Sequence, residues 1–244
     1  MGDALVLCYH GISEHWPSAV SPARLRQHVE LLLRRGYEGV TFTDAVTASR
    51  ARRTFAVTFD DAYVSVLEHA YPTLAALGVP GTVFVVTAFA DEGRRVDWPG
   101  MERFGVGADA GELRSLSWEQ LRRLVEAGWE VGSHSHTHPR LTQLADASLE
   151  RELQDSREAC ERELARPCLS VAYPYGDVDD RVVFAAAAAG YRAGCTLSVS
   201  TSGPLSWPRV GVYRIDSPAR FRLKVSPVTR RARRVLALRG TLSR

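Results

Sequence analysis

Two short motifs contain the residue types that could do chemistry in this chain. Asp60 and Asp61 directly follow the apolar run Phe55–Phe59, and His134 and His138 stand four residues apart after a second apolar run. One carboxylate and two imidazoles can hold a divalent metal ion and leave positions open for water or substrate. The second carboxylate is then free to act as a general base on that water. Together the two motifs predict metal-assisted hydrolysis.

Apolar runs and amphipathic segments alternate along the chain and would position these motifs. Eight segments are typical of buried strands: Leu5–Tyr9, Gly39–Phe42, Phe55–Phe59, Thr82–Val86, Glu130–Ser133, Ser170–Tyr173, Ala193–Leu197 and Arg209–Ile215. Five segments between them are typical of helices: Ser21–Arg35, Tyr63–Leu77, Ser117–Ala127, Ser148–Glu163 and Val178–Ala189. This alternation predicts a parallel sheet with helices outside it. The candidate residues follow strand ends, which share one rim in a barrel of parallel strands.

The composition is that of one globular α/β domain. The 244 residues are 45% hydrophobic and 24% charged, and no apolar stretch approaches the roughly 20 residues of a membrane span. Residues 88–116 interrupt the alternation and are predicted to form a long loop over one face. The chain opens on Met1-Gly2-Asp3 and continues into a strand-like run without a basic export signal, which indicates a cytoplasmic protein. The four scattered cysteines lack Cys-x-x-Cys spacing and are expected to be reduced packing residues.

Charge is concentrated at the end of the chain. After Asp216 there is no acidic residue, while nine basic residues follow: Arg220, Arg222, Lys224, Arg230, Arg231, Arg233, Arg234, Arg239 and Arg244. We therefore expect a catalytic domain in residues 1–227 and a basic tail in residues 228–244. Such a tail can touch an anionic membrane, here at the inner face, or form a solvated helix. It lacks the interleaved aromatic residues of a nucleic-acid platform, which argues against nucleic-acid binding.

The motifs resemble those of the NodB-homology polysaccharide deacetylases, the fourth carbohydrate esterase family. Thr58-Phe59-Asp60-Asp61 is similar to the first family motif, and the run from Gly132 to Leu141, with His134 and His138, is similar to the second. Tyr173-Pro174-Tyr175-Gly176 resembles the third. The resemblance extends from about Leu5 to Phe221, with Tyr9-His10 near the start as supporting context.

This resemblance implies a distorted or incomplete (β/α) barrel, with seven parallel strands and outer helices, that removes the N-acetyl group of an amino sugar. Asp61, His134 and His138 would bind the metal, and Asp60 would be the general base. The backbone N–H of Tyr175 would stabilise the oxyanion, with Tyr175 and Gly176 in contact with the substrate. Zinc suits this ligand set best, although cobalt, nickel and manganese also fit it.

Three departures from the family pattern leave roles to be filled. Ala62 stands where glycine usually follows the paired aspartates, and Ala172 stands where an arginine usually orients the base. Arg209 is the candidate for that orienting role. Many members use a late histidine as general acid, but this chain has no histidine after His138, so His10 or a proton returned by Asp60 would protonate the leaving amine.

Two further questions stay open in the sequence. Trp98 either lines a sugar subsite from the long loop or anchors that loop by packing. The site either deacetylates an amino sugar or hydrolyses another non-peptide C–N bond, of the cyclic imide type. A catalytically inactive, glycan-binding relative is the third alternative, and retention of all three metal ligands together with Asp60 argues against it.

Overall fold

A computed structural model describes residues 4–16, 19–48, 53–98, 101, 111–197 and 203–232. One parallel sheet organises them, with its strands in the order β8-β7-β6-β5-β4-β3-β1-β9 and β2 paired to β3. The strands are β1 (Leu5–Tyr9), β2 (Glu38–Gly39), β3 (Thr54–Phe59), β4 (Gly81–Val85), β5 (Glu130–Ser133), β6 (Ser170–Ala172), β7 (Ala193–Thr196), β8 (Trp207–Pro208) and β9 (Val210–Gly211). Every pairing is parallel, as the strand–helix alternation predicted.

The sheet is nearly closed into a barrel by a single short segment. β8 pairs with β7 and β9 pairs with β1, so residues 207–211 contact both ends of the strand order. Arg209 lies between the two, and its N–H donates to the Thr196 carbonyl (2.9 Å). The strand order contains eight strands rather than the predicted seven because the last one is split at Arg209. The fold is thus the expected distorted barrel.

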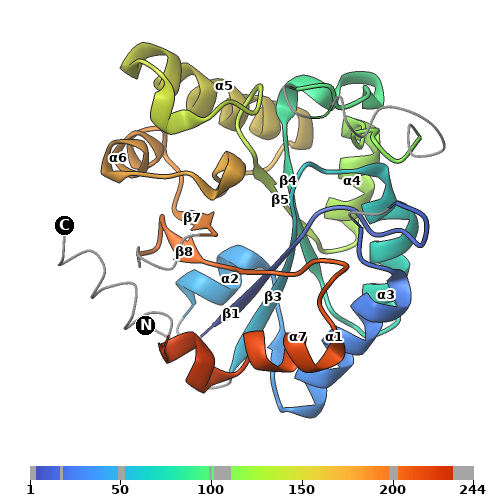
Figure 1. Ribbon diagram of the computed structural model, residues 1–244. Coiled ribbons are helices and arrows are strands. Elements are labelled where there is room, and N and C mark those ends of the chain that lie inside the picture. Colours follow the sequence, from blue (N-terminus) through green and yellow to red (C-terminus); the bar gives the residue numbers. More distant parts are fainter. Residues whose placement is uncertain are drawn as a thin grey trace.

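Helices surround this sheet, with α5 and α6 on one side and α1, α3 and α4 on another (Figure 1). Their bounds are α1 (Pro22–Arg34), α2 (Phe42–Thr47), α3 (Tyr71–Ala75), α4 (Trp118–Glu126), α5 (Asp146–Leu164), α6 (Asp180–Ala188) and α7 (Pro218–Lys224). The Ser117 hydroxyl and Gln120 side chain form a capping box at the start of α4. Left-handed glycines end the predicted helical segments as expected, at Gly36, Gly78, Gly128 and Gly190.

Several predicted element boundaries were wrong, for local reasons. The helix predicted over Tyr63–Leu77 is a π-helical turn, Val66–Ala70, followed by α3, whose second residue is Pro72. The strand predicted over Gly39–Phe42 stops at Gly39, because the Thr41 hydroxyl accepts from Asp44 N–H and starts α2. The strand predicted over Arg209–Ile215 ends at Gly211, because the Asp216 carboxylate accepts from Tyr213 N–H and turns the chain.

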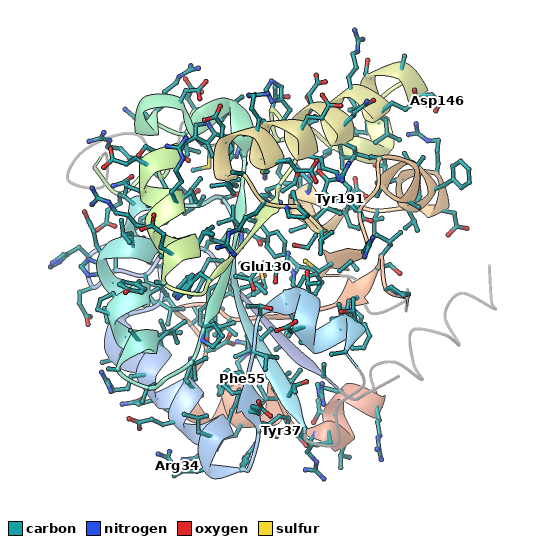
Figure 2. All side chains as sticks on the ribbon, turned by 180° about the vertical axis from the view of Figure 1, so that it is seen from behind. Arg34, Tyr37, Phe55, Glu130, Asp146 and Tyr191 are labelled. Atoms are coloured by element: carbon teal, nitrogen blue, oxygen red, sulfur yellow. The ribbon has the colours of Figure 1, made fainter. Side chains whose placement is uncertain are left out.

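Glu130, the first residue of β5, closes the amino-terminal end of the barrel with polar contacts. Its carboxylate accepts from Thr43 N–H (2.8 Å), from the Thr43 and Ser170 hydroxyls (each 2.5 Å), and from the Thr82 hydroxyl (3.3 Å). Figure 2, drawn from behind, labels Glu130 near the middle of the molecule. These contacts attach α2 to the starts of three strands.

The end of the chain is described as far as residue 232. Residues 227–232 are helical, and Arg230 donates to the Ala4 carbonyl (3.4 Å). Most of the predicted basic tail, residues 233–244, lies outside the described residues. None of the described helices combines the length and the apolar character that a membrane crossing requires.

Candidate active site

The predicted motif residues meet at the carboxyl ends of the strands. Asp60 and Asp61 follow β3, His134 follows β5, the Pro174–Gly176 turn follows β6, and Arg209 joins β8 to β9. They surround a pocket of about 340 Å³ whose lining is His10, Trp16, Asp60, Asp61, Tyr63, Trp98, Met101, His134, His138, Tyr175, Gly176, Leu197 and Tyr213. Because all strands are parallel, residues far apart in the sequence come to the same rim.

Asp61, His134 and His138 form a cluster that fits a metal ion. Asp61 Oδ1 lies 3.5 Å from His134 Nε2 and 3.6 Å from His138 Nε2, and all three side chains are buried. His134 Nδ1 lies 2.7 Å from the Ala172 carbonyl, which can only accept, so Nδ1 carries the proton and Nε2 presents its lone pair. Asp61 Oδ1 is a buried oxygen with no hydrogen-bond partner among the described residues. A cation would satisfy that oxygen.

Burial keeps the ligand candidates in forms suited to this role. Burial lowers the pKa of His138 to about 2, so its imidazole is neutral and can donate a lone pair. Burial also raises the pKa of Asp61 in the metal-free protein, which means that its charge lacks a sufficient partner there. A bound cation would supply the missing positive charge.

Asp60 is held by Arg209 in a buried, bidentate ion pair. Arg209 Nη1 donates to Asp60 Oδ1 (2.6 Å) and Nη2 donates to Oδ2 (2.7 Å). The Cys8 thiol also donates to Oδ2 (3.4 Å). Burial raises the pKa of Asp60, but the charge and hydrogen bonds of Arg209 outweigh it, so the pKa of Asp60 lies well below its usual range. Asp60 is therefore a carboxylate of fixed orientation.

Backbone strain is concentrated in the three motifs. Six described non-glycine residues have a positive φ, and five of them lie in motif turns: Asp61, Ala62, Ser135, His138 and Tyr175. Ala62 thus adopts the left-handed turn (φ 49°) for which the family pattern favours glycine. Such strain persists only where neighbouring contacts impose it, and it is typical of functional sites.

One acidic side chain from α5 imposes the turn that contains the two histidines. The Glu152 carboxylate accepts from the N–H groups of His136 and Thr137 (each 2.9 Å) and from the Thr137 hydroxyl (2.6 Å). The Ser135 hydroxyl accepts from His138 N–H (3.0 Å). These bonds fix the backbone from which both imidazoles project.

The remaining predicted residues lie around the same pocket. His10 follows β1 and lines the pocket with Asp60 and Asp61. Tyr175 is 44% exposed at the mouth of the pocket. The Gly176 carbonyl accepts a hydrogen bond from the Thr196 hydroxyl (2.6 Å). Trp98 is only 5% exposed, and its ring stacks on that of His138 with centroids 4.2 Å apart. The indole thus packs on a metal-ligand candidate while one edge lines the pocket.

Sequence reasoning missed several residues that complete the site. Tyr63 lines the pocket together with Asp61, and its ring meets the Trp16 ring edge to face. Tyr213, Cys8 and Glu152 were also missed. Of these, Tyr63 had a signal, because it follows the paired aspartates by two residues. Glu152 had none, since it lies mid-helix, 14 residues after His138.

Comparison with known proteins gives a consistent result. A family model described as polysaccharide deacetylase matches residues 47–194. YxkH of Bacillus subtilis, a polysaccharide deacetylase by name, is 24% identical over 196 residues, which cover 78% of this chain and 63% of YxkH. The poly-beta-1,6-N-acetyl-D-glucosamine N-deacetylase of Staphylococcus aureus is 24% identical over 64% of this chain and 51% of its own length. This chain therefore spans less than two thirds of either relative.

The fold is also found among solved structures. The Streptococcus pyogenes deacetylase PplD, solved in complex with acetate, superposes with a TM-score of 0.75 at 22% identity. The match covers 92% of this chain and 98% of that one. At this identity the likeness shows that the two chains share a fold.

Proposed function

The chain belongs to the polysaccharide deacetylase family, and on that premise we propose that it is a metal-dependent N-deacetylase of an acetylated amino sugar. The observation that carries this proposal is the pairing of two adjacent carboxylates with different partners. Asp60 is bound to Arg209, while Asp61 faces His134 and His138. One carboxylate is thereby held ionised in a fixed orientation beside the pocket, and the other is placed to bind a cation.

Asp61, His134 and His138 would hold the metal, most plainly zinc. When bound there, a divalent ion supplies Lewis-acid polarisation of the amide carbonyl and acidifies the attacking water. The neutral His138 imidazole and the fixed tautomer of His134 present lone pairs toward the ion. Cobalt, nickel or manganese would be accepted by the same donor atoms.

The proton chemistry falls to residues of the chain itself. Asp60 takes the proton of the attacking water, and Arg209 holds both carboxylate oxygens so that their orientation is set before substrate binds. The Tyr175 N–H, in its left-handed turn, donates to the developing oxyanion. His10, which lines the same pocket, donates a proton to the leaving amine.

The lining and the volume of the pocket suit a sugar ring as the part of the substrate that enters it. Its walls include the rings of Trp16, Tyr63, Trp98, Tyr175 and Tyr213, and its 340 Å³ is at the small end for ligand sites. Aromatic faces suit the C–H face of a pyranose and the acetyl methyl group. We place this activity in residues 1–227.

Acetate release from metal-stripped protein tests the proposal. Adding zinc or cobalt should restore acetate release from N-acetylglucosamine oligomers, and His134→Ala should abolish it together with stoichiometric metal binding. His136→Ala is the matched control, because this neighbouring histidine bonds to the Thr87 hydroxyl (2.9 Å) and is not in the cluster. Metal binding without acetate release, but with hydrolysis of a cyclic imide, would replace the proposed reaction. Absence of metal binding would indicate an inactive relative.

The role of His10 has a separate test. His10→Ala should lower turnover while metal content stays unchanged. The control His15→Ala, at an exposed histidine, should change neither turnover nor metal content. Unchanged turnover in His10→Ala would leave Asp60 to return the proton it has taken.

A further inference from the structure

The segment that follows the closing strand exposes an unusual set of aliphatic side chains. Ile215, Leu223 and Val228 are 74%, 62% and 76% exposed. Among the described residues only Tyr175, Tyr213 and Phe184 join them as exposed large hydrophobic residues. Half of that set therefore lies within residues 215–228, and we call residues 213–232 the carboxyl-terminal face. A contiguous exposed apolar patch marks an interaction surface, and these three residues come from one short segment of the chain.

The same face is strongly basic. It carries six basic residues, which are Arg214, Arg220, Arg222, Lys224, Arg230 and Arg231, and a single acidic one, Asp216. The Asp216 side chain is fully buried and already bonded to Lys224 (2.6 Å) and Arg220 (3.0 Å). Its negative charge is thus neutralised inside the protein, and the exposed Arg220, Arg222 and Arg231 make the outward charge of the face positive.

This face adjoins the mouth of the candidate active site. Tyr213 lines the pocket, and the Lys224 ammonium lies 5.1 Å from the centre of its ring. Lys224 also donates to the Gly211 carbonyl (2.9 Å), which ties α7 to β9. In Figure 1 the segment runs from the end of the sheet to α7 beside α1. A partner bound to the carboxyl-terminal face would therefore lie next to the substrate entrance.

We propose that the carboxyl-terminal face binds the surface of an anionic lipid bilayer and presents the pocket to substrate at that surface. Basic side chains are attracted to anionic headgroups, while aliphatic side chains between them enter the headgroup boundary. A soluble polyanion would attract the basic side chains but leave Ile215, Leu223 and Val228 in water. The combination of basic and aliphatic side chains therefore favours a membrane. Residues 233–244 add four arginines, and their like charge disfavours them as the cover of this face.

Vesicle co-sedimentation of the full chain tests the proposal. The protein should bind phosphatidylcholine vesicles that contain phosphatidylglycerol, bind pure phosphatidylcholine weakly, and lose binding as salt is raised. Arg222→Gln with Arg231→Gln should weaken the partition coefficient about 25-fold, at about fivefold for each charge near an anionic surface. Leu223→Ser with Val228→Ser should weaken it about tenfold, because two exposed aliphatic groups no longer enter the interface.

Matched variants on another face separate this surface from general effects. Phe184→Ser removes an apolar residue that is also 76% exposed, and Arg151→Gln removes a charge from α5; neither should change binding. Equal losses in these controls, or loss only when Arg233, Arg234 and Arg239 of the tail become glutamine, would overturn the proposal. So would full retention of binding in Leu223→Ser/Val228→Ser, which would indicate a purely electrostatic polyanion site. The assay involves no catalysis, so its failure would leave the deacetylase proposal standing.

Discussion

Two carboxylates, the buried Asp60 and the half-buried Glu130, occupy opposite ends of the same sheet and are held in opposite ways. Asp60, after the end of β3, is bound by the Arg209 guanidinium and the Cys8 thiol. Glu130, at the start of β5, is bound by three hydroxyls and one backbone N–H, all of them neutral. The first arrangement fixes a charge beside a pocket, and the second attaches α2 to the strands.

The backbone differs between the two ends as well. Five of the six described non-glycine residues with positive φ lie in the motif turns at the carboxyl end, and none lies in the segments that contribute donors to Glu130. The carboxyl end, where the chemistry is proposed, contains strained backbone and a buried ion pair. The amino-terminal end, which contributes to stability, contains unstrained backbone and neutral hydrogen-bond donors. If so, substitutions at the two ends should affect different measurements.

Among substitutions that leave the metal-ligand candidates intact, Asp60→Asn should have the largest effect on activity. An amide cannot take the proton of the attacking water, so acetate release should fall about 10²- to 10⁴-fold. Stoichiometric metal should remain, because Asp61, His134 and His138 are unchanged. Steady-state kinetics and metal analysis of the purified variant check both statements. Acetate release close to that of the unmodified protein would remove Asp60 from the mechanism.

Arg209→Met should have the largest effect on stability. It leaves Asp60 as a buried charge without its main partner, which typically costs about 3–5 kcal/mol of unfolding free energy. Arg140→Met is the matched control, because Arg140 is half-exposed and its contact with Asp177 is 3.7 Å. Urea denaturation of the metal-free proteins would measure both. A loss no larger than that of the control would contradict the assignment of a buried pair.

The stability loss of Arg209→Met should also depend on pH. In the unmodified protein the pKa of Asp60 is depressed, so the pair contributes its full stability above the unfolded pKa and loses it as pH falls through the folded value. Without Arg209, burial dominates and raises the pKa of Asp60, so stability of the variant falls as pH rises through and above the unfolded pKa. The difference between the two proteins should therefore be largest near pH 7 and shrink toward pH 4. A difference independent of pH would mean that packing, not charge, causes it.

At the carboxyl end of the sheet, which contains Asp60 and Arg209, the sequence predicted the site residues better than the bounds of the strands that carry them. That Asp60, Asp61, His134 and His138 would lie together could be predicted because their motifs follow apolar runs and parallel strands share a rim. Arg209 was a candidate partner of Asp60 only through the family resemblance, because Ala172 stands where an arginine usually orients the base. Arg209 was expected to be the first residue of a strand over Arg209–Ile215, whereas it separates β8 from β9. A two-residue strand leaves no alternating pattern to detect, so its bounds could not be predicted.

The contacts around Glu130, at the amino-terminal end of the sheet, could not be predicted from the sequence. Glu130 was assigned to a strand, but nothing in its neighbours indicated that Thr43, Thr82 and Ser170 would converge on it. α2 was missed because it is six residues long and its start overlaps an apolar run. α7 was missed because it lies within the basic segment, although Ser217-Pro218 is a helix-start signal.

Glu130→Gln should affect stability and leave activity unchanged. An amide can accept through one oxygen only, so part of the donor set around it is left unsatisfied, at a cost of about 1–3 kcal/mol. Thermal unfolding and acetate release, measured on the same preparation, would show a lower melting temperature with unaltered turnover. Reduced turnover at full folding would indicate that the two ends of the barrel are coupled.

Ala165→Gly should have the smallest effect, and it separates strain at a functional site from strain at a helix end. Ala165 is the sixth non-glycine residue with positive φ (50°) and ends α5 far from the motifs. It is exposed, so glycine relieves left-handed strain of about 1–2 kcal/mol and loses about 0.4–1 kcal/mol to the freer unfolded chain. The net expectation is a gain of about 0.5–1 kcal/mol without a change in activity. Ala62→Gly, at φ 49° but fully buried, should gain less in urea denaturation, because its methyl group also packs in the core. A larger gain at Ala62 would mean that the left-handed strain in the first motif exceeds the stabilisation from packing of the Ala62 methyl group.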